Sequence, residues 1–358
     1  MATPFDAQRR DAATHPWSPD SLAHAVEQHT WTPPRPKPRH PRLPALLAIL
    51  VATIGLWVVA TPHAWSIVGL PLDGDDAVAS ATLPTGAVVA AHDGVEPVGP
   101  AVSHATYGST SLVRYLERSM IAQVEQIDVT YWWTSGSRAA HINDAMFEAI
   151  TQSPYLFVDS WRVQTLTSEV GQTVTIEPAY SYDTGEAQRR QAVVAAAVDQ
   201  WLSAAGVHGA MSDAEKAIAI HDVVAANATY DHDAAALIET GGSSPAVTQS
   251  QEAYGIFGAG SAVCNGYAQA YLVLAEAAGL DSVIVTGTAW NEVATGRHAW
   301  NLVSIGGEWK LVDTTWDDSG DLSPTPDTYL LVDLDDPALN TRQADADWMV
   351  DGNIAAYI

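Results

Sequence analysis

Small and apolar residues recur at a spacing of three to four positions in the stretch that follows Cys264. They are Ala268, Tyr271, Leu272, Ala275 and Ala278. This spacing predicts an α-helix with one buried face, and Gly279 offers its end. Cys264, the only cysteine in the chain, would then lie in the first turn of the helix.

A different pattern, alternation of apolar and polar positions, follows in residues 297–305. Gly306-Gly307 then supplies a two-residue hairpin turn, and residues 308–314 have the pattern of a returning strand. The sequence therefore predicts an antiparallel hairpin after the helix.

The register of this hairpin brings two polar side chains together. If Ile305 pairs with Glu308, then His298 and Asp313 lie on one face as diagonal neighbours within side-chain reach. The start of a helix favours an anion, because its first backbone N–H groups are unpaired and its dipole is positive there, so Cys264 is placed where a thiolate is stabilised. A thiol, an imidazole and a carboxylate together predict nucleophilic Cys-His-Asp chemistry.

Three sequence blocks carry a resemblance to a known family. Residues 262–268 read Ala-Val-Cys-Asn-Gly-Tyr-Ala, residues 296–301 read Gly-Arg-His-Ala-Trp-Asn, and residues 309–318 read Trp-Lys-Leu-Val-Asp-Thr-Thr-Trp-Asp-Asp. In their order and spacing they resemble the bacterial transglutaminase-like domains of the papain-type thiol fold, over roughly residues 212–335. The resemblance implies an α+β core in which a helix bearing the cysteine packs on an antiparallel sheet bearing the histidine and the aspartate.

Roles for individual residues follow from this reading. Cys264 is expected to be the nucleophile, His298 the general base and then acid, and Asp313 the carboxylate that orients the imidazole. Three aromatic residues are expected to line the substrate cleft: Tyr254, Trp300 and Trp316.

The resemblance also has flanking support and one departure. Residues 219–231 look like the family's entry helix, which ends in a Tyr-Asp pair. Relatives commonly show a Tyr-Phe-Leu strand after the aspartate block, whereas residues 329–333 read Tyr-Leu-Leu-Val-Asp, with no histidine after them. This departure puts the closing segment of the domain in doubt.

A small α+β unit, residues 105–208, is predicted ahead of the catalytic domain, residues 209–358. Its expected helices are residues 109–127, 141–151 and 186–205, and its expected strands are residues 129–133, 157–166 and 172–178. No residue pattern in this unit indicates a ligand. Similar segments precede the core in some relatives, and this analogy suggests a layer that covers or extends the cleft.

The N-terminal residues predict a membrane anchor. Residues 43–61 contain no charged residue and would span about 29 Å as a helix, close to the thickness of a bilayer. Residues 1–42 are rich in proline and arginine and are expected to be a disordered cytoplasmic tail, so that residues 62–104, a flexible spacer, and the body would face outward. A cleaved signal peptide is the competing interpretation, but the 42-residue leader argues against it.

The net charge of the chain limits the class of partner that it can bind. The chain has a formal net charge of −26, and six of its 16 basic residues precede position 43. An acidic body of this kind makes nucleic acid an unsuitable partner. The histidines show no metal-ligand spacing, and no phosphate-binding or dinucleotide motif is present, so the sequence predicts neither a metal nor another cofactor.

Taken together, the sequence predicts a single-pass cell-membrane protein whose extracytoplasmic domain transfers acyl groups from peptide or protein amides, cell-wall peptides included. The same triad serves hydrolysis and transamidation, so that choice stays open. The alternative is a catalytically inactive module that uses the cleft to bind a peptide or a wall fragment.

Overall fold

The computed structural model describes residues 68–69, 95–134, 140–168, 171–290, 295–318, 327–346 and 348–355. The chain divides into two compact units, Met1–His63 and Ala64–Ile358, and every described residue belongs to the second. The predicted tail and the predicted membrane span lie outside the described residues. Within the described ranges, no helix is long and apolar enough to cross a membrane.

A five-stranded antiparallel sheet contains the predicted hairpin. Its strand order is β10-β9-β8-β7-β11. The strands are β7 (Ser282–Trp290), β8 (Thr295–Ile305), β9 (Glu308–Val312), β10 (Leu330–Asp333) and β11 (Arg342–Ala344). The last of these strands in the chain, β11, pairs with the first, β7, and so brings a distant segment to the edge of the sheet.

The β8–β9 hairpin has the register that the sequence predicts. Ile305 pairs with Glu308, and the two turn residues, Gly306 and Gly307, have φ angles of 60° and 88°. Positive φ angles at both central positions are what this kind of hairpin turn requires, and glycine adopts them without a steric penalty. The position of His298 relative to Asp313 depends on this turn.

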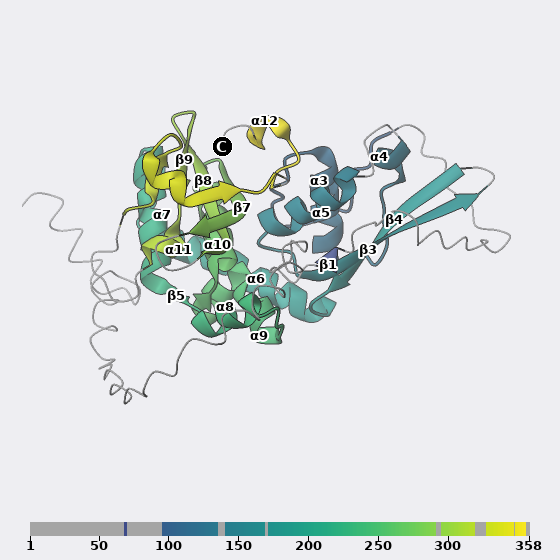
Figure 1. The fold of residues 1–358 in the computed structure, drawn as a ribbon, viewed down its shortest axis with the longest axis horizontal. Helices are drawn as coiled ribbons and strands as arrows, with labels where there is room; N and C mark the ends of the chain where they lie inside the picture. Colours follow the sequence, from purple (N-terminus) through teal and green to yellow (C-terminus); the bar gives the residue numbers. More distant parts are fainter. Residues whose placement is uncertain are drawn as a thin grey trace, which may run out of the picture. The chain divides into compact units, whose positions relative to one another are not determined.

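Helix α10 (Cys264–Ala277) begins at the predicted residue and packs against β7 and β8 (Figure 1). Ala268 of the helix lies in one apolar cluster with Ile284 of β7 and Ala299 of β8. Asn301 of β8 donates a hydrogen bond from Nδ2 to the Ala268 carbonyl oxygen at 3.0 Å. The predicted α+β core, a cysteine-bearing helix on an antiparallel sheet, is therefore present.

The predicted α+β unit precedes this core and is built around a second sheet, of order β1-β3-β4-β2. Its elements are β1 (Val68–Gly69), α3 (Ser111–Ile121), β2 (Ile127–Asp128), α4 (Thr130–Thr134), α5 (Ala140–Gln152), β3 (Val158–Ser168), β4 (Gly171–Tyr180) and α6 (Thr184–Ala204). The three predicted helices and the two long strands are confirmed, with shifted ends. Strand β1 falls within the predicted spacer, and these two residues therefore belong to a sheet.

The predicted strand over residues 129–133 is wrong, because this segment forms α4. Asp128 Oδ1 accepts the Thr130 N–H at 2.9 Å at the start of the helix. Trp132 is buried, with its ring 4.7 Å from that of Tyr115 on α3. Bulky residues over so short a stretch are compatible with either structure, and tertiary packing decides between them.

The remaining elements surround α10 or follow it. They are α7 (Asp213–Asn227), β5 (Thr229–Tyr230), α8 (His232–Glu239), α9 (Pro245–Ser250), the π-helical turn η1 (Gly255–Ala259), β6 (Ser261–Ala262), α11 (Thr314–Asp317), the 3-10 turn η2 (Pro337–Thr341) and α12 (Gly352–Ala355). Strands β5 and β6 form a short parallel pair in which Tyr230 lies beside Ala262, two residues before Cys264.

The unit ahead of the core is joined to the five-stranded sheet by Gln152. This buried side chain, at the end of α5, donates to the Ile284 carbonyl oxygen at 2.6 Å and accepts the Ile284 N–H at 2.8 Å. It thereby satisfies two backbone groups of β7 across the boundary predicted at residue 208. Both predicted parts belong to the one compact unit Ala64–Ile358.

Candidate active site

Asp313 is held at the point where β9 ends. The pairing of β8 with β9 stops at Asn301 and Val312, and α11 begins at Thr314 in place of the last residues of the predicted strand. Asp313 caps this short helix, since its Oδ1 accepts the Trp316 N–H at 3.1 Å. The cap fixes the orientation of the carboxylate, because one oxygen is committed to the backbone.

The other oxygen of Asp313 receives two hydrogen bonds from side chains. His298 of β8 approaches Oδ2 through Nε2 at 2.7 Å, and Arg342 of β11 approaches it through Nη1 at 2.7 Å. All three side chains are buried. The two residues that the sequence places on one face are therefore in direct contact, and a third residue, which the sequence does not predict, joins them.

This arrangement favours the charged forms of the histidine and the aspartate. Burial alone would lower the pKa of His298, but the Asp313 carboxylate and then the Cys264 side chain raise it to about 9. Burial alone would raise the pKa of Asp313, but His298 and Arg342 hold it below its ordinary range. An imidazolium beside a carboxylate is thus the stable form of the pair near neutral pH.

Cys264 lies at the start of α10, and its side chain is near enough to His298 to raise the pKa of the imidazole. Since Nε2 of His298 faces Asp313, Nδ1 is the ring nitrogen left for the sulfur. The thiol is buried, with 6% of the residue exposed. Val263, the residue that caps the helix, makes no side-chain hydrogen bond to the first turn.

The three predicted substrate-binding aromatic residues lie in different environments. Trp316 is half-buried, and its ring stacks on His298 with the centroids 5.2 Å apart. Trp300 is 6.0 Å from the same ring but is buried, with only 2% of its surface exposed. Tyr254 lies elsewhere, and its hydroxyl accepts a hydrogen bond from Arg189 at 3.0 Å. The structure thus brings Trp316 and Trp300 to the triad, and places Tyr254 in another network.

Two residues beside the triad are absent from the site that the sequence predicts. Arg342 comes from the closing segment, and its pairing with Ala289 of β7 gives no local sequence signal. Tyr230 belongs to the Tyr-Asp pair at the end of residues 219–231, the segment that resembles the family's entry helix. The sequence predicts no role for this pair. Burial raises the pKa of Tyr230, and the charge of the Cys264 side chain raises it further.

A pocket of about 70 Å³ lies beside the first turn of α10. Asn265, which directly follows Cys264, lines it together with Gln269 of the same helix. Phe147 of α5 and Phe157, which precedes β3, form part of the opposite wall. The unit ahead of the core therefore borders a pocket at the first turn of α10.

Metal-ligand chemistry is not evident in the described part of the chain, where no group of three or more histidine, cysteine, aspartate or glutamate residues could hold a metal ion. The other buried histidine, His221 of α7, is engaged by acidic neighbours. Its Nε2 is 3.3 Å from Asp317 Oδ2, and its Nδ1 is 3.0 Å from Asp222 Oδ1. The contact with Asp317 joins α7 to α11.

Comparison with known proteins identifies the core. Residues 201–314 match the sequence model of the family described as Transglutaminase-like superfamily. Among curated proteins, none matches the chain significantly. Residues 201–314 are therefore similar to this superfamily, and the matched range includes Cys264, His298 and Asp313 but ends before Arg342.

Two solved structures are similar at low identity. One is described as a TGase, with 16% identity, a TM-score of 0.31 and coverage of 47% of each chain. The other, from Cytophaga hutchinsonii, is described as a candidate cysteine protease, with 15% identity, a TM-score of 0.27 and coverage of 43% of this chain and 61% of that one. The chain thus spans less than two thirds of either protein.

Proposed function

We propose that the protein transfers acyl groups from peptide or protein amides by nucleophilic catalysis at Cys264. The observation that carries the proposal is the buried contact between His298 Nε2 and Asp313 Oδ2 at 2.7 Å, with Cys264 at the start of α10 near enough to raise the pKa of His298. In this arrangement the carboxylate fixes the imidazole, and the imidazole is positioned to exchange a proton with the sulfur.

The reaction would proceed in two halves. His298 holds the thiol proton on Nδ1, and the thiolate attacks the carbonyl carbon of the amide; the backbone N–H of Cys264 is one donor available to the developing oxyanion. When the tetrahedral intermediate collapses, the C–N bond breaks, the amine leaves with the proton from His298, and a thioester remains on Cys264.

The second half decides between the two enzyme classes. Water or a primary amine attacks the thioester, His298 takes its proton, and the sulfur leaves as the thiolate. Water yields an acid, whereas an amine yields a new amide. We favour hydrolysis slightly, because no second site for a cationic substrate can be identified from the sequence.

Acylation of the full-length chain by a small activated ester, p-nitrophenyl acetate, tests the proposal. Intact mass should show one acetyl group on the wild-type protein and none on Cys264→Ala, which should keep its melting temperature because alanine preserves the apolar start of α10. A primary amine added in increasing concentration should then divert acetate to acetamide if the enzyme is a transamidase. Acetylation of Cys264→Ala at the wild-type rate would exclude the thiol mechanism, and no acetylation of either protein would favour the peptide-binding alternative.

We further propose that residues 43–61 anchor the protein in the membrane, with the catalytic domain outside. The support is the uncharged stretch with basic residues on its N-terminal side. Protease added to intact cells should digest the body and spare the N-terminal tail. A protected body, or a mature chain that begins near residue 61, would contradict the anchor.

A further inference from the structure

Arg342 is a buried cation whose described oxygen contact is with the carboxylate of the triad. Its side chain is 3% exposed and donates from Nη1 to Asp313 Oδ2 at 2.7 Å. Its Nε and Nη2 atoms are buried and have no hydrogen-bond partner among the described residues. The guanidinium therefore makes its one described charge contact with Asp313.

Aromatic rings hold the guanidinium in place. Its central carbon lies 4.6 Å from the ring centroid of Trp316, 4.7 Å from that of Tyr329 and 5.3 Å from that of Trp300. Two of these rings, Trp316 and Trp300, also flank His298. A planar guanidinium can stack on rings and donate a hydrogen bond at the same time, and a lysine cannot reproduce this geometry.

We propose that Arg342 is a positioning residue of the active site, the fourth member of a chain that runs Arg342–Asp313–His298–Cys264. It fixes the Asp313 carboxylate in the rotamer that receives His298, and its charge keeps that carboxylate ionised in a buried site. This inference rests on the proposed function, because the role given to Arg342 is to hold His298, through Asp313, toward the Cys264 thiol.

The surrounding charges are consistent with this role. His298 from β8 and Arg342 from β11 are the charged groups that lower the pKa of Asp313. Tyr230 of β5 lies near both Cys264 and Asp313, as the rise in the pKa of Tyr230, due first to burial, indicates. Asp335 and Asp336 line a cavity of about 310 Å³ that Arg342 also lines. Arg342 is thus the cation of this cluster besides His298.

A second buried arginine provides a matched control. Arg190 of α6 donates to Glu252 at 2.9 Å and lies 3.8 Å and 4.2 Å from the ring centroids of Tyr182 and Tyr254. It therefore has the same kind of environment, with a buried carboxylate and aromatic rings, but none of its described contacts is with the triad. Replacement of either arginine removes a buried ion pair, and replacement of Arg190 also removes its contact with Glu186 at 2.7 Å.

The experiment measures the rate at which iodoacetamide alkylates Cys264 as a function of pH, read by intact mass on the full-length chain. The proteins are the wild type, Arg342→Gln, Arg342→Lys and Arg190→Gln, each checked for folding by circular dichroism. In Arg342→Gln, the pH below which Cys264 stops reacting should move up by roughly one to two units, because Asp313 loses a charge-assisted hydrogen bond. Arg342→Lys should recover the pH profile in part, but alkylation should stay slower than in the wild type. Arg190→Gln should keep the wild-type profile.

Two results would overturn the inference. One is a folded Arg342→Gln with the wild-type rate and profile; the other is an equal change in Arg190→Gln, which would show that any buried arginine has this effect. If Arg342→Gln does not fold, Arg342→Lys decides, since wild-type rate and profile in that variant would exclude a specific role for the guanidinium. Failure of wild-type Cys264 to accept an acetyl group would count against the proposed function instead.

Discussion

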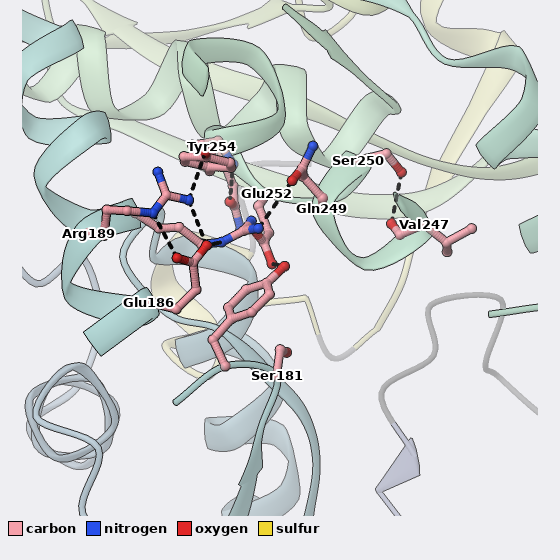
Figure 2. A network of polar contacts seen from close by, with 12 residues as sticks. Ser181, Glu186, Arg189, Val247, Gln249, Ser250, Glu252 and Tyr254 are labelled. Atoms are coloured by element: carbon pink, nitrogen blue, oxygen red, sulfur yellow. Dashed lines mark hydrogen bonds and ion pairs between the residues drawn. The ribbon is translucent and has the colours of Figure 1, made fainter. Parts of the chain in front are cut away.

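Among the residues that the structure describes, two buried arginine–carboxylate pairs look alike, but the pKa of one carboxylate is raised and that of the other is lowered. Arg342 binds Asp313 at 2.7 Å in the catalytic sheet, and Arg190 of α6 binds Glu252 at 2.9 Å. Aromatic rings cover both guanidinium groups. The second network is shown in Figure 2, where Glu252 lies among Glu186, Gln249 and Tyr254.

The two pairs differ in the second side chain that hydrogen bonds with the carboxylate. Glu252 accepts its other hydrogen bond from the neutral Tyr182 hydroxyl at 2.9 Å. Burial raises the pKa of Glu252 to about 7, although the charge of Arg190 lowers it. Asp313 has His298 as its other side-chain partner, and its pKa is lowered despite deeper burial. An arginine alone is therefore not enough to keep a buried carboxylate strongly acidic here, whereas an arginine and an imidazole together are.

The largest difference between the two pairs should appear in the rate of acyl transfer when each carboxylate is neutralised in turn. Asp313→Asn should keep the fold but lower acyl transfer by about 10³- to 10⁴-fold, because the amide no longer holds the imidazole in the required form. Glu252→Gln should leave acyl transfer unchanged. Single-turnover acetylation of both variants checks this, and near wild-type rates in Asp313→Asn would remove the orienting role from that residue.

A smaller effect, on stability, should come from Arg190→Gln. At a pH above about 7, where Glu252 is ionised, this change leaves a buried carboxylate without its cation and should lower the free energy of unfolding by about 3–5 kcal/mol, the usual cost of breaking a buried pair. Denaturant unfolding measures it, and acylation per folded molecule should not change. A loss of acylation without a loss of stability would mean that the Arg190 network acts on the site.

The smallest effects should separate the two pairs by pH. His298 has a raised pKa in the folded state, so its ion pair contributes fully below the unfolded value of about 6.5 and is lost as the pH rises through about 9. Glu252 also has a raised pKa, so its contribution is lost as the pH rises from about 4.3 to about 7. The windows hardly overlap.

Melting temperatures measured across pH 4 to 10 for the wild type, His298→Gln and Glu252→Gln would resolve these windows. Each variant should lack the decline in its own window and keep the other. The same slope in all three proteins would show that neither group titrates as the structure implies.

Local patterns account for most of what the sequence could predict. The helix from Cys264 and the hairpin at Gly306-Gly307 follow from short-range periodicity and turn chemistry, so the sequence alone is enough to place their side chains. Arg342 is different, since it reaches Asp313 only through the pairing of β11 with β7. Sequence distance hides such contacts.

Tertiary packing explains two further features that local patterns do not show. Residues 129–133 have bulky side chains that suit a strand, but burial of Trp132 against α3 makes them helical. The position of Tyr254 ahead of the cysteine loop predicts a place in the cleft, yet its ring lies against Arg190 of α6. Neither outcome depends on the residues nearby in the sequence, which is why no local pattern indicates it.

The most direct measurement of the central claim compares alkylation of Cys264 at neutral pH in the wild type and in His298→Gln. If the thiol is activated by the His298–Asp313 pair, iodoacetamide should label the wild type rapidly, and His298→Gln should react no faster than an ordinary buried thiol. Equal rates in the two folded proteins would contradict the claim that Cys264 and His298 form a reactive pair.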